Sequence, residues 1–318
     1  MRAAVFSAGT TVCSEVPEPE PGSGELLVAV TSAGLNAADL LQRAGRYPPP
    51  PGYRQDRPGL EIAGRIVGLG PGARRFSLGD AVMGIVGGEG QAELAVIHER
   101  VAMPVPEALP LEVAGGFPEV FLTAHDALVT QAQLTSGERV LVTGAAGGVG
   151  TAAVQLAAAL GAEVVAEVRN PLQRAAVGAL GATAVGPEEV AAHGPFDVVA
   201  ELVGGPNLPR DLASLSLGGR VVVIGLGGGA ATSLDLGLLL QRRARLFGTT
   251  LRNRPLEEKA IVARRVERQV LPLLERQVVR VLVEASYPLD DAAAAYERFT
   301  KGAKLGKVLL VNTAEPAR

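Results

Sequence analysis

The chain has 318 residues, of which 47% are hydrophobic, and it carries a net charge of −3 and a single cysteine. This length indicates two domains, and the acidic balance argues against a dedicated nucleic-acid or anionic-membrane surface. Because Cys13 is alone, an internal disulfide and every multi-cysteine zinc site are excluded. The sequence has no apolar run of membrane-span length and no signal-peptide layout, so we expect a soluble, cytoplasmic protein.

The first third of the chain is rich in short β-type runs. Gly and Pro separate the segments RAAVF, ELLVAVTSAG, IAGRIVGLG, DAVMGIV and AELAVI. Strand-length runs at this spacing predict a compact, barrel-like β module. Around residues 112 to 130 the apolar residues change to helical spacing.

From residue 139 onward, strand-like and helix-like segments alternate. RVLVTG leads to GVGTAAVQLAAALGA, EVVAEV leads to PLQRAAVGALGA, and FDVVAELVGG, NLPRDLASLSLGG, RVVVIG and ARLFGTT follow. Apolar strands alternating with amphipathic helices predict a parallel sheet covered on both faces.

The tail of the chain returns to mixed elements. We expect a long helix over LEEKAIVARRVERQVLPLLERQ, a strand in VRVLVEASYPL, a helix from Asp290 to about Lys301, and a last strand in GKVLLVN. The parallel α/β block lies in the middle of the chain. The two ends are therefore predicted to form one domain around it.

A glycine-rich turn follows the strand at 139–142 and opens a helix. This arrangement presents backbone N–H groups and the positive helix end to a phosphate. Alanine replaces the first glycine of the G-x-G-x-x-G pattern, while the second and third are present, and the flanking strand and helix supply the required context. We expect the turn to bind a dinucleotide through Ala146, Gly147, Gly148, Val149 and Gly150.

The end of the next strand indicates which dinucleotide is bound. An NAD site places Asp or Glu there, about 20 residues after the turn, to accept from the ribose 2′-OH. This chain has Arg169, followed by Asn170 and Arg174. A guanidinium suits a 2′-phosphate, so NADPH is favoured. Glu167 leaves the strictness of that choice open, because it could pair with Arg169 or still reach the ribose.

At this point the chain resembles the medium-chain dehydrogenase/reductase superfamily over nearly its whole length. More narrowly, it is similar to the zinc-independent, ζ-crystallin-like quinone oxidoreductases. The motifs that carry the resemblance are GLNAADLLQRAGRYPPPPG, PGLEIAGRIVGLGPGARRFSLGDAVMG, LTAHDAL, GAAGGVGTAAVQLAAALGA, RLFGTTLRNR and YPLDDAAAAYERFTKGAKLGKVLL.

The resemblance implies an α/β fold in two domains. These are a GroES-like β-barrel catalytic domain over 1–119 and 258–318, and a Rossmann domain with a doubly wound parallel sheet over 120–257, which binds NADP. It also implies further cofactor contacts, at Gly225, Leu226, Gly227 and Arg252. The segment between GATAV and FDVVAELVGG is shorter than is usual in the family, which predicts a trimmed crossover.

The positions that hold the catalytic zinc in related alcohol dehydrogenases correspond to Asn36 and Leu60 here. Neither suits zinc, so no metal is expected. The resemblance instead places Asn36, Tyr47 and Thr123 around the nicotinamide and the acceptor. Asn36 could fix the nicotinamide ribose or an acceptor oxygen, and Tyr47 could donate to a developing oxyanion.

The scattered histidines and the acids Asp39 and Glu61 read as scaffold, with Asp39 a candidate cap for the following helix. The predicted activity is zinc-free, NADPH-dependent hydride transfer to a quinone or another conjugated carbonyl. An enoyl-thioester reductase is the alternative, with Arg43, Arg46 and Arg54 as a basic entrance for coenzyme A. A non-catalytic NADPH-binding structural or RNA-binding protein is the second alternative. The resemblance favours a homodimer, with a tetramer as the alternative, and the sequence does not identify the acceptor.

Overall fold

The computed structural model describes residues 1–312, which fall into two compact units. Unit 1 comprises Met1–Glu119, Leu251–Gln277 and the chain from Val283 onward. Unit 2 comprises Val120–Thr250 and Val278–Leu282. Both ends of the described chain therefore contribute to unit 1, and Arg252 belongs to it.

Unit 2 is built on a six-stranded sheet in which every neighbouring pair is parallel. Its spatial order is β10-β9-β8-β11-β12-β13. In chain order this is 3-2-1-4-5-6, the doubly wound arrangement, so the parallel sheet predicted from the sequence is confirmed. The strands are β8 (Arg139–Val142), β9 (Glu163–Glu167), β10 (Thr183–Val185), β11 (Phe196–Glu201), β12 (Leu215–Val223) and β13 (Arg245–Gly248).

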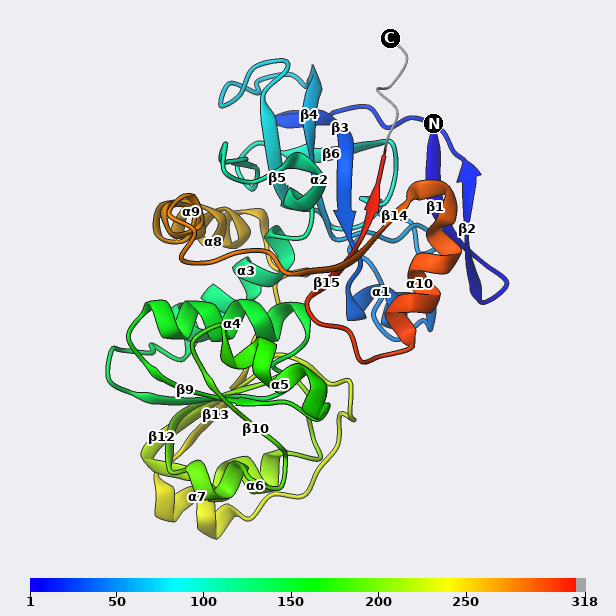
Figure 1. Ribbon diagram of the computed structural model, residues 1–318. Coiled ribbons are helices and arrows are strands. Elements are labelled where there is room, and N and C mark those ends of the chain that lie inside the picture. Colours follow the sequence, from blue (N-terminus) through cyan, green and yellow to red (C-terminus); the bar gives the residue numbers. More distant parts are fainter. Residues whose placement is uncertain (313–318) are drawn as a thin grey trace. The chain divides into compact units, whose positions relative to one another are not determined.

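Helices cover both faces of this sheet. Figure 1 shows α4 and α5 above the strands and α6 and α7 below them. Their bounds are α4 (Gly148–Ala159), α5 (Pro171–Gly178), α6 (Leu208–Ala213) and α7 (Leu236–Arg242). The crossover from β10 to β11 contains a single 3-10 turn, η2 (Val190–His193), in place of a full helix. This agrees with the shortened crossover predicted from the sequence.

The helix predicted over NLPRDLASLSLGG is shorter in the structure. Helix α6 ends at Ala213, and strand β12 already begins at Leu215. The side chain of Leu215 is fully buried in the hydrophobic core of unit 2. Burial in the sheet therefore outweighs the helical pattern that the preceding residues share.

Unit 1 is a β-rich module centred on strand β3 (Glu25–Gly34). A seven-stranded sheet has the order β14-β15-β3-β4-β5-β7, with β6 also paired to β3. The other strands are β4 (Glu61–Leu69), β5 (Ala81–Ile85), β6 (Leu94–His98), β7 (Met103–Pro104), β14 (Val283–Pro288) and β15 (Lys307–Val311), and β1 (Arg2–Ser7) and β2 (Thr10–Glu15) form a separate hairpin.

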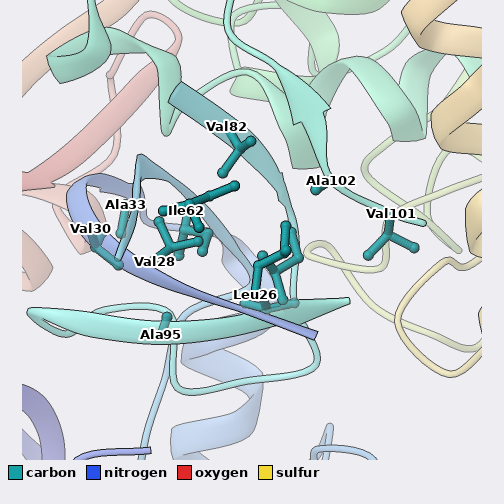
Figure 2. Close-up of a cluster of buried hydrophobic side chains, with 12 residues drawn as sticks. Leu26, Val28, Val30, Ala33, Ile62, Val82, Ala95, Val101 and Ala102 are labelled. Atoms are coloured by element: carbon teal, nitrogen blue, oxygen red, sulfur yellow. The ribbon is translucent and has the colours of Figure 1, made fainter. Parts of the chain in front are cut away.

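Side chains at every second position of β3 fill the core of unit 1. Leu26, Val28 and Val30 point to the same face and pack with Ile62 and Val82 from β4 and β5 (Figure 2). This alternation is the period of two expected of a strand. The barrel-like module predicted for the first third is confirmed.

The helices of unit 1 differ from the sequence prediction in one place. They are α1 (Ala37–Arg43), α2 (Leu111–Ala114), α8 (Leu256–Gln269), α9 (Leu271–Glu275) and α10 (Ala292–Thr300), with the turn η3 (Leu289–Asp291) before α10. Helix α3 (Pro118–His125) begins at the end of the segment Met1–Glu119 and continues into the π-helical segment η1 (Asp126–Gln131) of unit 2. The long helix expected over 256–277 is interrupted between α8 and α9. Pro272 lacks the N–H that the helix interior requires, and its ring opposes the preceding turn.

Candidate active site

The glycine-rich turn joins β8 to α4 at the point where the strand order of unit 2 reverses. Dinucleotides bind at this switch point in doubly wound sheets. Gly147 is the N-cap of α4, and no side chain caps the helix. The first N–H groups of a helix have no intrahelical partner, so this end of α4 offers free backbone donors and a positive dipole to an anion.

The glycines of the turn have different structural tasks. Gly144, directly before the predicted pattern, has φ +56° and makes the sharp bend, a task the sequence reading missed. A Cβ on Gly150 would lie 2.5 Å from the Gly144 carbonyl oxygen and 2.7 Å from Ala145 Cα. A Cβ on Gly147 would meet only the Gly144 oxygen, at 3.4 Å. Gly150 is thus required by helix–strand packing, whereas Gly147 has room for a methyl group when no ligand is bound.

At the end of β9, the two charged side chains that could contact the cofactor ribose or its phosphate have different surroundings. Glu167 is 4% exposed, and its carboxylate pairs with the guanidinium of Arg210 at 2.7 Å. Arg169 is exposed, and within residues 1–312 no ion pair or hydrogen bond engages its side chain. The available charged group at this strand end is therefore a cation.

Asn170 and Arg174 have local partners. The Asn170 side chain caps α5 by accepting from the Leu172 N–H at 3.1 Å. Arg174 Nε donates to the Val168 carbonyl, and its guanidinium pairs with Glu189 at 3.1 Å. Both residues therefore shape the loop that presents Arg169.

A second glycine-rich loop follows β12 and contains the predicted contacts Gly225, Leu226 and Gly227. Gly229 forms an isolated parallel bridge with Gly204. The buried Glu201 carboxylate accepts hydrogen bonds from the N–H groups of Val203 and Gly204. Glu201 thereby fixes the loop after β11, and Gly204 of that loop forms the bridge to the loop after β12.

Asn36 lies at the start of α1 in a buried polar network. Lys307 Nζ donates to Asn36 Oδ1 at 2.7 Å and pairs with Glu61 Oε1 at 2.6 Å. Asn36 Nδ2 donates to the same Glu61 oxygen at 2.9 Å. The sequence analysis missed Lys307; the available signal was a basic residue at the start of the apolar strand KVLLV.

Asp39 anchors the backbone around Asn36. Its Oδ2 accepts from the Asn36 N–H at 2.8 Å, which closes the predicted cap of α1. Burial raises the pKa of Asp39 to about 6, although the N–H groups of Asn36 and Gly59 oppose the shift. Burial, followed by repulsion from Glu61, raises the pKa of Glu119 to about 8. Glu119 is attached to the network, because its backbone N–H donates to Glu61 Oε2 at 2.8 Å.

Tyr47 is positioned by Arg252. The Arg252 guanidinium is 5.2 Å from the centre of the Tyr47 ring, and Nη1 donates to the Tyr47 carbonyl at 3.2 Å. Nε donates to Gly87 O, and Nη2 donates to Gln42 Oε1. Arg252 was assigned to the cofactor phosphates from the sequence. In the structure it is 5% exposed and clamps the loop that carries Tyr47.

The remaining predicted residue, Thr123, lies on α3 and is partly exposed. It belongs to unit 2 with the glycine turn, Arg169 and the loop after β12, whereas Asn36, Tyr47 and Arg252 belong to unit 1. Among the described residues, no helix combines the length and apolar character needed to cross a membrane. The same residues contain no group of three His, Cys, Asp or Glu side chains that could hold a metal ion.

Two family models match the chain. The alcohol dehydrogenase GroES-like domain matches residues 22–133, and the zinc-binding dehydrogenase domain matches residues 148–268. The second name implies zinc, but Asn36 and Leu60, the positions where the resemblance would place catalytic zinc ligands, lie within the range of the first model. Leu60 offers no ligand atom, and Asn36 Oδ1 and Glu61 Oε1 already bind the Lys307 ammonium.

Relatives of known name match nearly the full chain. The quinone oxidoreductase of Rattus norvegicus is 30% identical over 311 residues, covering 94% of this chain and 92% of the relative. The acryloyl-coenzyme A reductase of Metallosphaera sedula is 32% identical over 329 residues, covering 93% and 95%. The solved structure of mycobacterial Rv1454c complexed with NADPH is 26% identical, with a TM-score of 0.86 and coverage of 98% of this chain and 100% of that one. Together with the doubly wound sheet and its glycine turn, these matches show that the chain belongs to the medium-chain dehydrogenase/reductase superfamily and is an NAD(P)-dependent oxidoreductase.

Proposed function

We propose that this protein is an NADPH-dependent quinone reductase that works without zinc. The observation that carries the cofactor choice is the charge arrangement at the end of β9. Arg169 is exposed and unpaired among the described residues, while Arg210 holds Glu167. A free guanidinium there favours a 2′-phosphate, and a carboxylate held by another arginine is a poor acceptor for a ribose hydroxyl.

In this proposal, the backbone N–H groups of the turn from Ala146 to Gly150 bind the pyrophosphate, except that of Gly147, which donates to Gly144 O at 3.0 Å. Gly225, Leu226 and Gly227 line the nicotinamide side, and Thr123 orients the carboxamide or the acceptor. The dinucleotide would supply the hydride. Tyr47, held by Arg252, donates a hydrogen bond to the oxyanion that develops on the acceptor.

The zinc-free part of the proposal rests on the donor set in unit 1. Asn36 and Glu61 bind an ammonium group, and Leu60 is apolar. Polarisation of the acceptor carbonyl is therefore assigned to hydrogen bonds and not to a Lewis acid.

Steady-state NADPH oxidation by chelator-treated protein tests these points, with a simple benzoquinone and crotonyl-CoA assayed in parallel. We expect turnover with the quinone, unchanged by the chelator. Loss of that turnover, restored by added Zn²⁺, would contradict the zinc-free assignment. NADPH binding without turnover of either acceptor would instead favour a non-catalytic role.

An enoyl-thioester reductase is the second candidate, and one pocket in unit 1 favours it. A pocket of ≈ 470 Å³ is lined by Phe6, Gln42, Arg43 and Arg54, among others. Arg54 pairs with Asp56, whereas the Arg43 guanidinium stacks 5.7 Å from the Tyr296 ring centre. The Phe6 ring and the Arg43 guanidinium suit the adenine and a phosphate of coenzyme A, whereas Arg54 is already paired within the lining. Turnover confined to crotonyl-CoA would support this function, with Tyr47 as the proton donor.

We also propose a homodimer, with a tetramer as the alternative. Strand β13 ends the parallel sheet, and Leu246 on this strand and Leu240 on the preceding helix α7 are exposed. Pairing with a second copy would cover this edge. Sedimentation analysis that finds only monomers at micromolar concentration would contradict the proposal.

A further inference from the structure

Two buried carboxyl groups meet beside the loop that follows β11 in unit 2. Glu201 ends strand β11, Asp211 lies on helix α6, and both side chains are fully buried. Asp211 Oδ1 accepts from the Arg210 guanidinium at 2.9 Å, whereas its Oδ2 is buried and has no N–H or O–H donor within residues 1–312. The Glu201 carboxyl group is within hydrogen-bonding reach of Asp211. Two acceptors bond to each other only through a proton, so one of the two groups must carry one.

The surrounding charges do not remove the need for this proton. The Arg210 guanidinium that bonds Asp211 also pairs with Glu167 at 2.7 Å, so three buried carboxyl groups share a single cation. Burial, followed by the neighbouring Glu201 carboxylate, raises the pKa of Asp211 to about 8. The other charged groups on the elements around α6 have their own partners, namely Arg242 of α7 with the Ala213 carbonyl, Arg220 of β12 with Glu138, and Asp197 at the start of β11 with the Arg139 N–H.

Glu201 determines the conformation of the loop after β11. Its Oε1 accepts from the N–H groups of Val203 and Gly204, at 2.5 and 2.6 Å, and its Oε2 accepts from Asn207 Nδ2 at 3.3 Å. The loop therefore depends on a Glu201 side chain that stays in place beside Asp211.

The same loop is joined to both parts of the proposed cofactor site in unit 2. The Leu202 N–H donates at 2.8 Å to the hydroxyl of Thr143, the residue directly before the glycine turn. On the other side, the Gly228 N–H of the loop after β12 donates to Val203 O at 2.7 Å. A displacement of the loop after β11 would therefore reach the glycine turn and the loop after β12 together.

Loss of the proton to solvent would place two negative charges side by side in a buried site. Like charges at this separation are strongly unfavourable, and movement of the Glu201 carboxylate away from Asp211 relieves them. That movement removes the acceptor of the Val203 and Gly204 N–H groups. We propose that Glu201 and Asp211 share one proton that fixes the loop after β11, and that unit 2 binds its dinucleotide more weakly as this proton is lost. The inference rests on the proposed function for the cofactor, but the shared proton belongs to the unliganded protein.

The first test measures the NADPH Kd by fluorescence titration between about pH 7 and about pH 9.5. In this range the 2′-phosphate of the cofactor, with a second pKa near about 6, keeps one charge state. For wild type we expect the Kd to rise by up to about tenfold per pH unit above the raised pKa of Asp211. Asp211→Asn keeps an uncharged hydrogen-bonding group of the same shape, so its Kd should stay within about twofold over the range.

A second variant and a control guard the test against misfolding. In Glu201→Gln the amide oxygen can accept from the two loop N–H groups while the amide nitrogen donates to Asp211, so the Kd should again be independent of pH. Glu163→Gln makes the same change at an exposed carboxylate of β9, which pairs with Arg139. This control should keep the pH dependence of wild type.

Hydrogen exchange reports on the loop without a cofactor. Protection of the backbone N–H groups over 202–207 in the unliganded protein should fall over the same pH range in wild type and stay level in Asp211→Asn.

The outcomes are distinguishable. A wild-type NADPH Kd that stays constant over the range, or an Asp211→Asn variant with the wild-type slope, would overturn the inference while the quinone assay still supports the proposed function. A protein that binds neither NADPH nor NADH overturns the proposed function, and hydrogen exchange of the loop then still tests the shared proton.

Discussion

Two single substitutions in the glycine turn should separate cofactor binding from folding. Gly147→Ala places a Cβ 3.4 Å from the Gly144 oxygen, which is ordinary contact, at a residue with φ −74°. Alanine is a worse N-cap than glycine by roughly 0.5–1 kcal/mol. Reduced freedom of the unfolded chain offsets this by about 0.4–1 kcal/mol. Stability should therefore change by less than about 0.5 kcal/mol, while the methyl group obstructs the pyrophosphate and weakens NADPH binding at least roughly tenfold.

Gly150→Ala should instead lower the stability of the folded protein. Its Cβ would lie 2.5–2.8 Å from backbone atoms of Gly144 and Ala145, which cannot move aside as a side chain can. We expect a loss of about 1–3 kcal/mol in stability, as for other overpacked interiors. Thermal unfolding and NADPH titration of both variants provide the comparison. A Gly147→Ala protein that binds NADPH like wild type would refute the assignment of this turn to the pyrophosphate, and an equally stable Gly150→Ala protein would refute the packing argument.

Three other substitutions test separate parts of the molecule. Arg169→Ala should raise the NADPH Kd roughly tenfold and leave the NADH Kd unchanged; equal effects on both cofactors in the titration would contradict the 2′-phosphate role. Arg252→Lys loses the planar fork around Tyr47 and should lower both the quinone kcat/KM and the melting temperature, and unchanged kinetics would remove Arg252 from the site. Burial, followed by the neighbouring Glu201 carboxylate, raises the pKa of Asp211 above its ordinary 3.8. Between the two pKa values, the folded protein retains a proton that the unfolded chain releases. Because of this group, the free energy of unfolding therefore falls by up to about 1.4 kcal/mol per pH unit as pH rises from the ordinary pKa towards the raised one. Urea unfolding of Asp211→Asn between about pH 5 and about pH 7 should show a shallower fall in unfolding free energy than wild type, and an identical slope would argue against the raised pKa of Asp211.

The parallel sheet and the β module could be predicted because their patterns are local. Apolar runs such as RVLVTG and RVVVIG are bounded by glycines, and each lies in one strand. Short elements were harder: α7 and β10 have few residues, and the break between α8 and α9 depends on a proline within a strongly amphipathic segment. Competition between helix and strand over 208–219 was resolved by burial of Leu215, which no window of sequence reveals.

In the candidate site too, contacts between neighbouring segments could be predicted and contacts between distant segments could not. The glycine turn and the residues after β9 follow one another in sequence, so their proximity could be inferred. The partners of Asn36 and Tyr47 come from distant segments. A basic residue at the start of the strand KVLLV marks Lys307 as unusual, but no local pattern shows that it meets Asn36 or that Arg252 meets Tyr47. Long-range ion pairs and hydrogen bonds depend on the fold as a whole, and one sequence without its structure does not supply them.

The Arg252 clamp bears on how acceptor specificity could be transplanted between relatives. The loop over 44–57 carries Tyr47, but the guanidinium that holds it comes from 205 positions further along the chain. A chimera that exchanges the loop alone would bring the hydroxyl without its support, and the grafted tyrosine would sample several positions. Exchange of the loop together with the short segment around Arg252 is the smallest unit that should move as a working module.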